Sequence, residues 1–201
     1  MKNYSILLFL LPTLLLSQQV AAQADALNLT VDLGAAQQKT DSFSESDSSA
    51  SVTLGYELSS NWSLNLSYTD FGKVFAGPGL LVTESGSYDT QHFIETKALG
   101  LTAQYLTDPL IAGWAFGARF GLMHVDTKLS SVAPEFMGGF SHSRLDSGTA
   151  PTIGALTTYA LTEKLALIVS ADYMAPEVET SGIGDEDIKT TRFAAGLKYH
   201  F

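Results

Sequence analysis

The sequence predicts an all-β chain, an eight-stranded antiparallel up-and-down transmembrane β-barrel. Eight segments place apolar residues at every second position, the period of a strand with two unlike faces. Their connections alternate between long and short, as in membrane barrels with short periplasmic turns and longer outer loops. The chain also ends within an alternating segment, 193–201, and a barrel that pairs its first strand with its last leaves no open edge there.

A cleaved secretory signal peptide is predicted at residues 1–24. Lys2 gives a positive start, 6–16 an apolar core, and 20–24 a small-residue cleavage site. A retained anchor would need about 20 apolar residues, whereas this run is shorter and contains Pro12. We therefore expect the barrel domain to span residues 25–201.

Composition excludes one class of partner. The chain has 11 Lys and Arg against 21 Asp and Glu, a formal net charge of −10, so it lacks the basic surface that nucleic acid requires. It has 17 glycines and no cysteine, which suits a strand-rich domain without disulfides. No cofactor is expected.

The first half of the barrel follows from four alternating segments. We expect strands at 27–35, 51–58, 62–69 and 93–105. The first and third connections, 37–49 and 72–92, are long and predicted to be loops, and the first of them is rich in Ser and Asp. The connection between them, 59–61, is a tight turn.

The second half repeats the pattern. Strands are expected at 114–122, 152–161, 165–173 and 193–201. Short turns at 107–109 and 162–164 alternate with long loops at 126–150 and 175–187. All four long loops therefore fall at one end, which a soluble sandwich or lipocalin has no reason to do.

Aromatic residues mark the other end. Two tryptophans begin strands after short turns, and four tyrosines lie near the ends of strands running toward that side. These six residues are Tyr56, Trp62, Tyr105, Trp114, Tyr159 and Tyr199. We interpret them as an outward-facing girdle at one membrane interface. Burial in a soluble core would not select one end.

Ionisable residues on the inner faces indicate a polar lumen rather than the apolar interior of a lipocalin. They are Asp32, Glu57, Arg119, Asp172, Arg192 and Lys198. We expect Asp172 and Asp32 to pair with Arg192, and Glu57 to pair with Lys198 or Arg119. Because side chains fill an eight-stranded barrel, such pairs would plug it. The alternative is that the pairs only offset one another's desolvation.

Three segments resemble small outer-membrane barrels of the OmpA-like and OmpX-like group: residues 62–72 (WSLNLSYTDFG), 116–122 (FGARFGL) and 154–173. The ending with Tyr199 and Phe201 resembles the C-terminal signal that the barrel-insertion machinery reads in that family. The resemblance implies a monomer in the outer membrane of a Gram-negative bacterium, surrounded by its lipids and lipopolysaccharide, with both termini periplasmic. No peptidoglycan-binding domain is expected after the eighth strand.

The expected role is envelope structure and surface interaction, with the outer loops as an adhesion or receptor surface and no catalysis. A narrow gated channel is the alternative. A lipid A-modifying enzyme, which small outer-membrane barrels include, is a third hypothesis, because a serine, histidine and acid set could form in the loops. Its candidates are His92, His124, His142, Ser141, Ser143, Asp126, Glu135 and Asp146. The motif expected of the deacylase is absent, so solvated histidines are the default.

Two further loop features allow binding. The last loop holds acidic residues that could collect a divalent cation through oxygen ligands, although their spacing is not that of an EF-hand: Glu177, Glu179, Asp185, Glu186 and Asp187. The second and third loops hold apolar residues, which either mark a binding surface or pack on one another above the barrel: Val74, Phe75, Leu80, Leu81, Phe136, Met137 and Phe140. We favour a solvated acidic loop and packed apolar residues.

Overall fold

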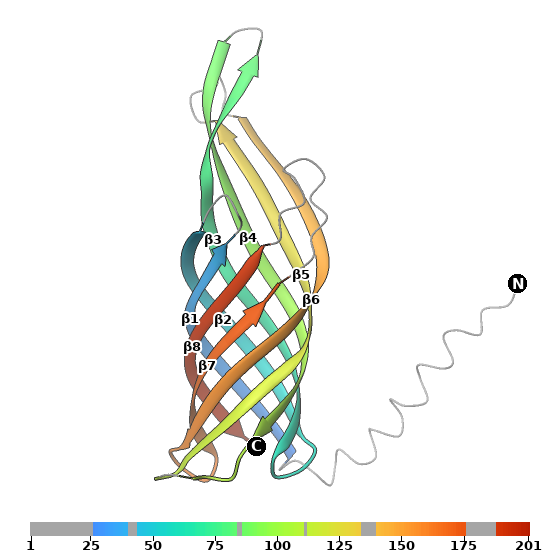
Figure 1. The fold of residues 1–201 in the computed structure, drawn as a ribbon, viewed down its shortest axis with the longest axis vertical. Coiled ribbons are helices and arrows are strands. Elements are labelled where there is room, and N and C mark those ends of the chain that lie inside the picture. The colour runs from blue at the N-terminus through green and yellow to red at the C-terminus, as the bar shows by residue number, and fades with distance from the viewer. Residues whose placement is uncertain (1–25, 40–43, 84–85, 111, 134–139, 176–187) are drawn as a thin grey trace, which may run out of the picture.

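The computed structural model describes residues 26–39, 44–83, 86–110, 112–133, 140–175 and 188–201. Eight strands, each antiparallel to its neighbours, form a closed barrel in the order β1-β2-β3-β4-β5-β6-β7-β8 (Figure 1). The predicted fold class is therefore confirmed. No helix within these ranges is both long and apolar enough to span a membrane.

The strands differ widely in length. They are β1 (Leu27–Lys39), β2 (Ser44–Glu57), β3 (Trp62–Thr83), β4 (Gly86–Leu106), β5 (Trp114–Ala133), β6 (Phe140–Ala160), β7 (Leu165–Met174) and β8 (Lys189–His200). β3 to β6 have 20 to 22 residues each, about twice the roughly 9–11 that cross a bilayer. Figure 1 shows the β3–β4 hairpin rising farthest, with β5 and β6 beside its lower part.

These lengths correct the prediction of three long loops. Most of 37–49, 72–92 and 126–150 is strand. Their polar composition favoured loops, but ladder hydrogen bonds come from backbone groups, and a pair such as Gln38 with Glu45 needs no apolar side chain. Residues 176–187, most of the fourth predicted loop, lie outside the described ranges.

Closure joins β1 to β8. Leu29 lies opposite Tyr199, Thr30 opposite Lys198, and the amide of Phe201, just past β8, donates to the carbonyl of Leu27 at 3.1 Å. The predicted short turns lie together at the end where β8 finishes (Figure 1). There Leu58 N donates to Trp62 O at 2.8 Å, and Leu161 N to Leu165 O at 2.9 Å.

The two faces of the strands are unlike in the predicted sense. On β3, Leu64, Leu66 and Tyr68 point outward and are 41–52% exposed. Ser63 and Asn65, on either side of Leu64 in sequence, point inward and are buried. An apolar exterior around a polar interior is the arrangement of a membrane barrel.

Candidate functional site

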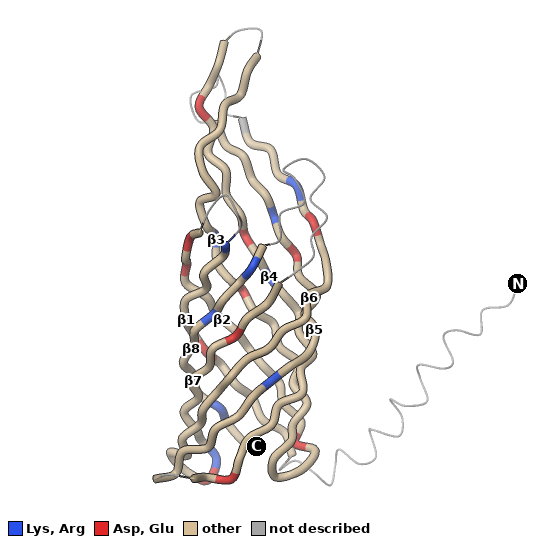
Figure 2. The backbone as a smooth tube through the Cα atoms, viewed as in Figure 1, with Lys and Arg blue, Asp and Glu red and all other residues tan. Residues whose placement is uncertain are grey.

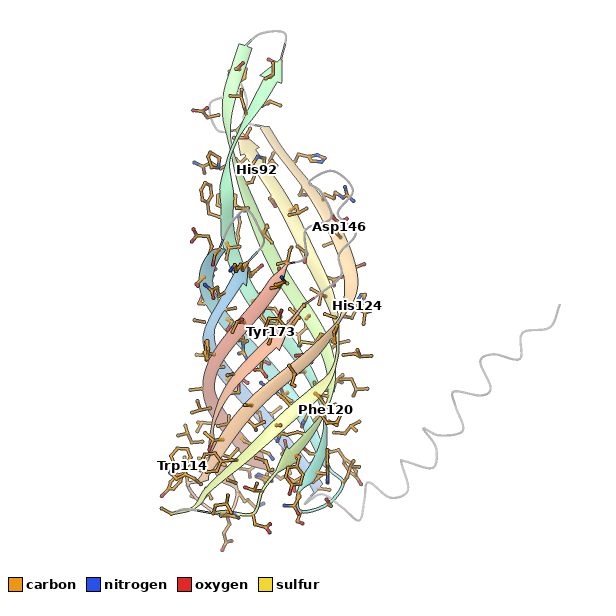
Figure 3. The ribbon with its side chains drawn as sticks, viewed as in Figure 1. His92, Trp114, Phe120, His124, Asp146 and Tyr173 are labelled. Atoms are coloured by element: carbon orange, nitrogen blue, oxygen red, sulfur yellow. The ribbon has the colours of Figure 1, made fainter. Side chains whose placement is uncertain are left out.

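The aromatic residues predicted to form a girdle lie at the turn end of the barrel. Trp62 is opposite Tyr105 with ring centroids 5.2 Å apart, and Trp114 is opposite Tyr159 at 5.1 Å. Figure 3 shows Trp114 at this lower end. Tyr199 contacts Phe201 at 5.4 Å.

The sixth girdle residue, Tyr56, pairs in register with Leu27 of β1. Outward aromatics at one height are suited to a membrane interface, where each ring has both apolar and wet surroundings.

The lumen near this end holds a cluster around Glu57. Its Oε1 accepts from Lys198 Nζ at 3.2 Å and from Asn28 Nδ2 at 3.3 Å, and lies 3.2 Å from His200 Nδ1. Lys198 is only 5% exposed. Of the two partners expected for Glu57, the structure selects Lys198.

Farther up the lumen, Arg119 of β5 makes a two-pronged ion pair with Asp172 of β7. Its Nη2 also donates to Ser170 Oγ at 3.1 Å. Gly154 of β6 lies between the two residues in register, and a Cβ on Gly154 would collide with the Asp172 carboxylate. Sequence reasoning missed this pair because it assigned Asp172 to Arg192 on the adjacent strand, and the glycine was the available signal.

Arg192 of β8 pairs with Asp32 of β1 and donates through Nε to Ser49 Oγ at 2.9 Å. Both charged residues are buried, at 3% and 5% exposure. The expected Asp32–Arg192 pair therefore forms, but the expected sharing of Arg192 with Asp172 is corrected. Asp172 is opposite Arg192 in register, yet its carboxylate is held by Arg119 across the open space above Gly154.

Above these pairs the lumen holds a cluster of apolar side chains, which sequence reasoning did not anticipate. Large buried side chains Phe71, Val125, Met123 and Met174 pack with three alanines into one cluster, the apolar layer. Its full membership is Ala36, Phe71, Ala98, Met123, Val125, Ala150 and Met174. Several members lay in or beside segments assigned to loops, so their inward direction was not considered.

Little space is left between the ion pairs and the apolar layer. A lumen pocket of about 30 Å³ is lined by Thr69, Phe71, Arg119, Asp172 and Thr190, among others. A water molecule needs about 10–15 Å³ of such space, so this pocket has room for a water or two.

Of the apolar residues expected in the outer loops, some are packed and others are exposed. Val74 is 2% exposed and packs with Ile94 and Ile188, and Phe75 contacts Phe93 at 5.7 Å. Leu80 is exposed on the upper hairpin, and Leu81 is half-buried. Phe136, Met137 and the side chain of Phe140 lie outside what the structure describes.

The candidate catalytic residues do not assemble. His92 Nδ1 lies 2.7 Å from Ser131 Oγ, a serine not among the candidates, and its Nε2 lies 3.4 Å from Thr90 Oγ1. His124 approaches Asp126 at 3.8 Å on the outer wall, well below His92 (Figure 3). Ser141, His142 and Ser143 are exposed on β6, Asp146 pairs with Arg144 at 2.9 Å, and Glu135 is outside the described ranges.

No serine, histidine and carboxylate are hydrogen-bonded in series within the described ranges. The part of the chain that the structure describes also has no group of three or more His, Asp or Glu that could hold a metal ion. The acidic residues from Glu177 to Asp187 fall outside it.

Residues 8–201 match the model of the outer membrane protein beta-barrel domain family. The chain belongs to this family. No curated protein matches the sequence, so the family and the solved structures define its relationships. Membership confirms the predicted outer-membrane location.

Three solved structures resemble this outer membrane barrel. Neisserial surface protein A matches with a TM-score of 0.62 and 13% identity over 88% of this chain and 97% of its own. A major outer membrane protein of Thermus thermophilus has a TM-score of 0.55 and 13% identity over 88% and 100%. OprG of Pseudomonas aeruginosa has a TM-score of 0.50 and 15% identity over 88% and 97%. At these identities the likeness establishes the shared fold.

Proposed function

We propose that this outer-membrane barrel is a closed, non-catalytic anchor that holds an interaction surface outside the cell. The surface is the protruding sheet, which we define as the parts of β3 to β6 beyond Asp70, Lys97, Asp126 and Ser147. The observation that carries the proposal is the continued pairing of these strands. Val74 pairs with Ile94, which pairs with Leu129, which pairs with Arg144, above the height at which β2 pairs with β3.

The lumen supports an anchor rather than a channel. The Arg119–Asp172 and Arg192–Asp32 pairs cross it at mid-height, and the apolar layer fills it above them. A conducting path would have to break buried ion pairs and also wet the apolar layer. Breaking the ion pairs and wetting the apolar layer both cost free energy, so the gated channel is the second candidate function.

The protruding sheet has two edges of different character. β3 has register shifts at Asp70/Lys73 and Phe75/Gly77, followed by Pro78, and such irregularities protect an edge from pairing. β6 pairs with β5 without any shift from Phe140 to Ala150. β7 pairs with β6 only from Thr152 onward, so above that point no described strand lies beside β6.

A regular strand edge that no described strand covers offers rows of backbone donors and acceptors, to which an extended polypeptide can add as a further strand. The partner class that suits this edge is therefore an extended peptide segment of a surface or secreted protein. Side chains on the outer face of β6, such as Ser143 and Leu145, would select among such segments.

A library of linear decapeptides displayed on phage and panned against the barrel in lipid nanodiscs tests this proposal. One variant shortens the β5–β6 hairpin at the Lys128–Leu145 pair, and a matched control shortens the β3–β4 hairpin at the Val74–Ile94 pair. Peptides enriched by the full barrel should fail to bind the first variant and still bind the second. No enrichment, or binding that survives loss of the β5–β6 hairpin, would overturn it.

A further inference from the structure

The outer wall of β3, β4 and β5 carries two rows of alternating charge, here called the charge lattice. Asp70, Lys97 and Asp126 lie side by side in register, and Lys73, Glu95 and Lys128 form the next row outward. Each charge therefore has the opposite sign beside it and above or below it. Figure 2 shows blue and red positions alternating on the upper part of β5.

The charge lattice begins where the apolar wall stops. Tyr68 and Leu99, paired in register directly below it, are each 52% exposed and outward-facing. An outward charge is too costly within the hydrocarbon of a bilayer, so the first row fixes the upper limit of the lipid-facing band. The lattice thus lies at the height of lipid headgroups in the outer leaflet.

Most of the lattice charges are compensated internally. Lys97 Nζ donates to Glu95 Oε1 at 2.7 Å and lies 3.7 Å from Asp70 Oδ2. The hydrogen bond from Lys97 lowers the pKa of Glu95, and the same bond raises the pKa of Lys97, so both stay charged at neutral pH. Lys73 lies over the Phe93 ring at 4.4 Å. Lys128 is exposed and has no carboxylate within 4.0 Å among the described residues.

Lys128 borders a groove of about 240 Å³ on this wall. Tyr68 and Leu99 line its lower, apolar part, and Leu145 lies beside Lys128 in register at its charged upper part. The charged part is formed by Glu95, Lys97, Asp126 and Lys128. A ligand that contacts both parts is an amphiphile with a charged headgroup, and Lys128, which lacks a close carboxylate among the described residues, suits a phosphate.

We propose that this groove binds one phosphorylated lipid of the outer leaflet. The Lys128 ammonium donates to the lipid phosphate, with Lys97 as the nearby second cation, and an acyl chain runs down the wall over Tyr68 and Leu99. Glu95 is neutralised by Lys97, whereas Asp126 faces His124 at 3.8 Å and opposes an anion. Asp126 therefore weakens the site and confines the phosphate to the Lys128 side. The site does not depend on any partner of the protruding sheet.

Native mass spectrometry of the full barrel in mild detergent tests the proposal, with bisphosphorylated lipid A as the probe. Wild type should retain one lipid, and Lys128→Gln should weaken retention about tenfold, as expected when one charge-assisted hydrogen bond is lost. Asp126→Asn should tighten it. Lys189→Gln, an exposed lysine at the start of β8, is the matched control and should retain lipid as wild type does. Unheated gel mobility verifies that every variant is folded.

Three outcomes would overturn the site. If the Lys128 and Lys189 variants lost lipid A retention equally, the lipid would be attracted to lysines in general and not to this groove. Equal retention of dephosphorylated lipid would show that the phosphate is not recognised. Displacement of lipid A by inorganic phosphate at similar concentrations would show a simple anion site without a lipid contribution. As a second variant, Leu99→Asn tests the acyl contact and should weaken binding of lipid A while leaving inorganic phosphate unaffected.

Discussion

Arg119 and Asp172 are joined across an intervening strand. They lie on β5 and β7, and Gly154 of β6 between them leaves the space in which the guanidinium meets the carboxylate. A side chain at position 154 would separate them, so three residues on three strands form one structural unit.

Removing one member of this unit should be costly. Asp172→Ala leaves the partly buried Arg119 guanidinium without its partner, and we expect a loss of about 3 kcal/mol in the free energy of unfolding. Urea unfolding in lipid vesicles, followed by gel mobility, measures it. The double variant Arg119→Met with Asp172→Leu should recover most of the loss, because no charge remains unpaired. Equal instability of the single and double variants would contradict the pairing.

Conductance measurements distinguish whether the ion pairs or the apolar layer close the lumen. Glu57→Ala frees Lys198 but leaves the apolar layer intact, so we expect a less stable barrel that is still silent in a planar bilayer. Phe71→Ser combined with Met123→Ser makes the layer polar, and it should give discrete channel events only when Asp172→Ala is added to open an ion pair below the layer. Channel events in Glu57→Ala alone would show that the ion pairs, not the apolar layer, close the lumen.

The girdle pair of Trp62 and Tyr105 should contribute to stability beyond area burial. Aromatic pairs at such distances add about 0.5–1.5 kcal/mol, so Trp62→Leu should lower the free energy of unfolding by about that amount. Trp62→Phe, which keeps an aromatic ring, is the matched variant. Urea titrations of both in vesicles of one composition give the difference, and identical midpoints would count against the pair.

Acid should weaken the contact between β2 and β3 at the base of the protruding sheet. Asp47 accepts backbone hydrogen bonds from Lys73 and Ser48, each at 2.7 Å, and these lower the pKa of Asp47. A lowered pKa means that the stabilisation is present above the ordinary carboxyl pKa of about 4 and is lost as pH falls through the lowered value.

Amide exchange of the Lys73 N–H, followed by NMR between pH 6 and pH 3, measures that effect after correction for intrinsic exchange. Protection should fall with acid in wild type. In Asp47→Asn it should be weak throughout and nearly independent of pH. Unchanged protection in both proteins would remove the proposed role of the carboxylate.

The membrane-spanning part was predictable because lipid and lumen impose opposite requirements on alternate residues. Leu64 and Asn65 differ so sharply in polarity that their directions follow from the sequence. Above the bilayer both faces of a strand can meet water, so residues there need not alternate in polarity. A polar pair such as Ser131 with His142 therefore resembles a loop in composition.

Ion-pair partners were only partly predictable, for a geometric reason. Asp172 and Arg192 are true register neighbours, so adjacency alone favoured their pairing. The long Arg119 side chain instead crosses β6, which is permitted only because residue 154 lacks a Cβ. To choose the partner of Asp172, one needs the relative register of β5, β6 and β7. The alternation of residues within each strand does not give that register.

The pairing of β1 with β8 has a consequence for how the protein is made. Leu29 and Tyr199 come from opposite ends of the folded chain, so the final seam cannot close until the last residues have been synthesised. Until then both terminal strands keep unsatisfied backbone groups, which a bilayer interior does not tolerate. Assembly must therefore protect the open edges of β1 and β8 at the same time. Pairing of these two strands removes the edges at which an open sheet could aggregate.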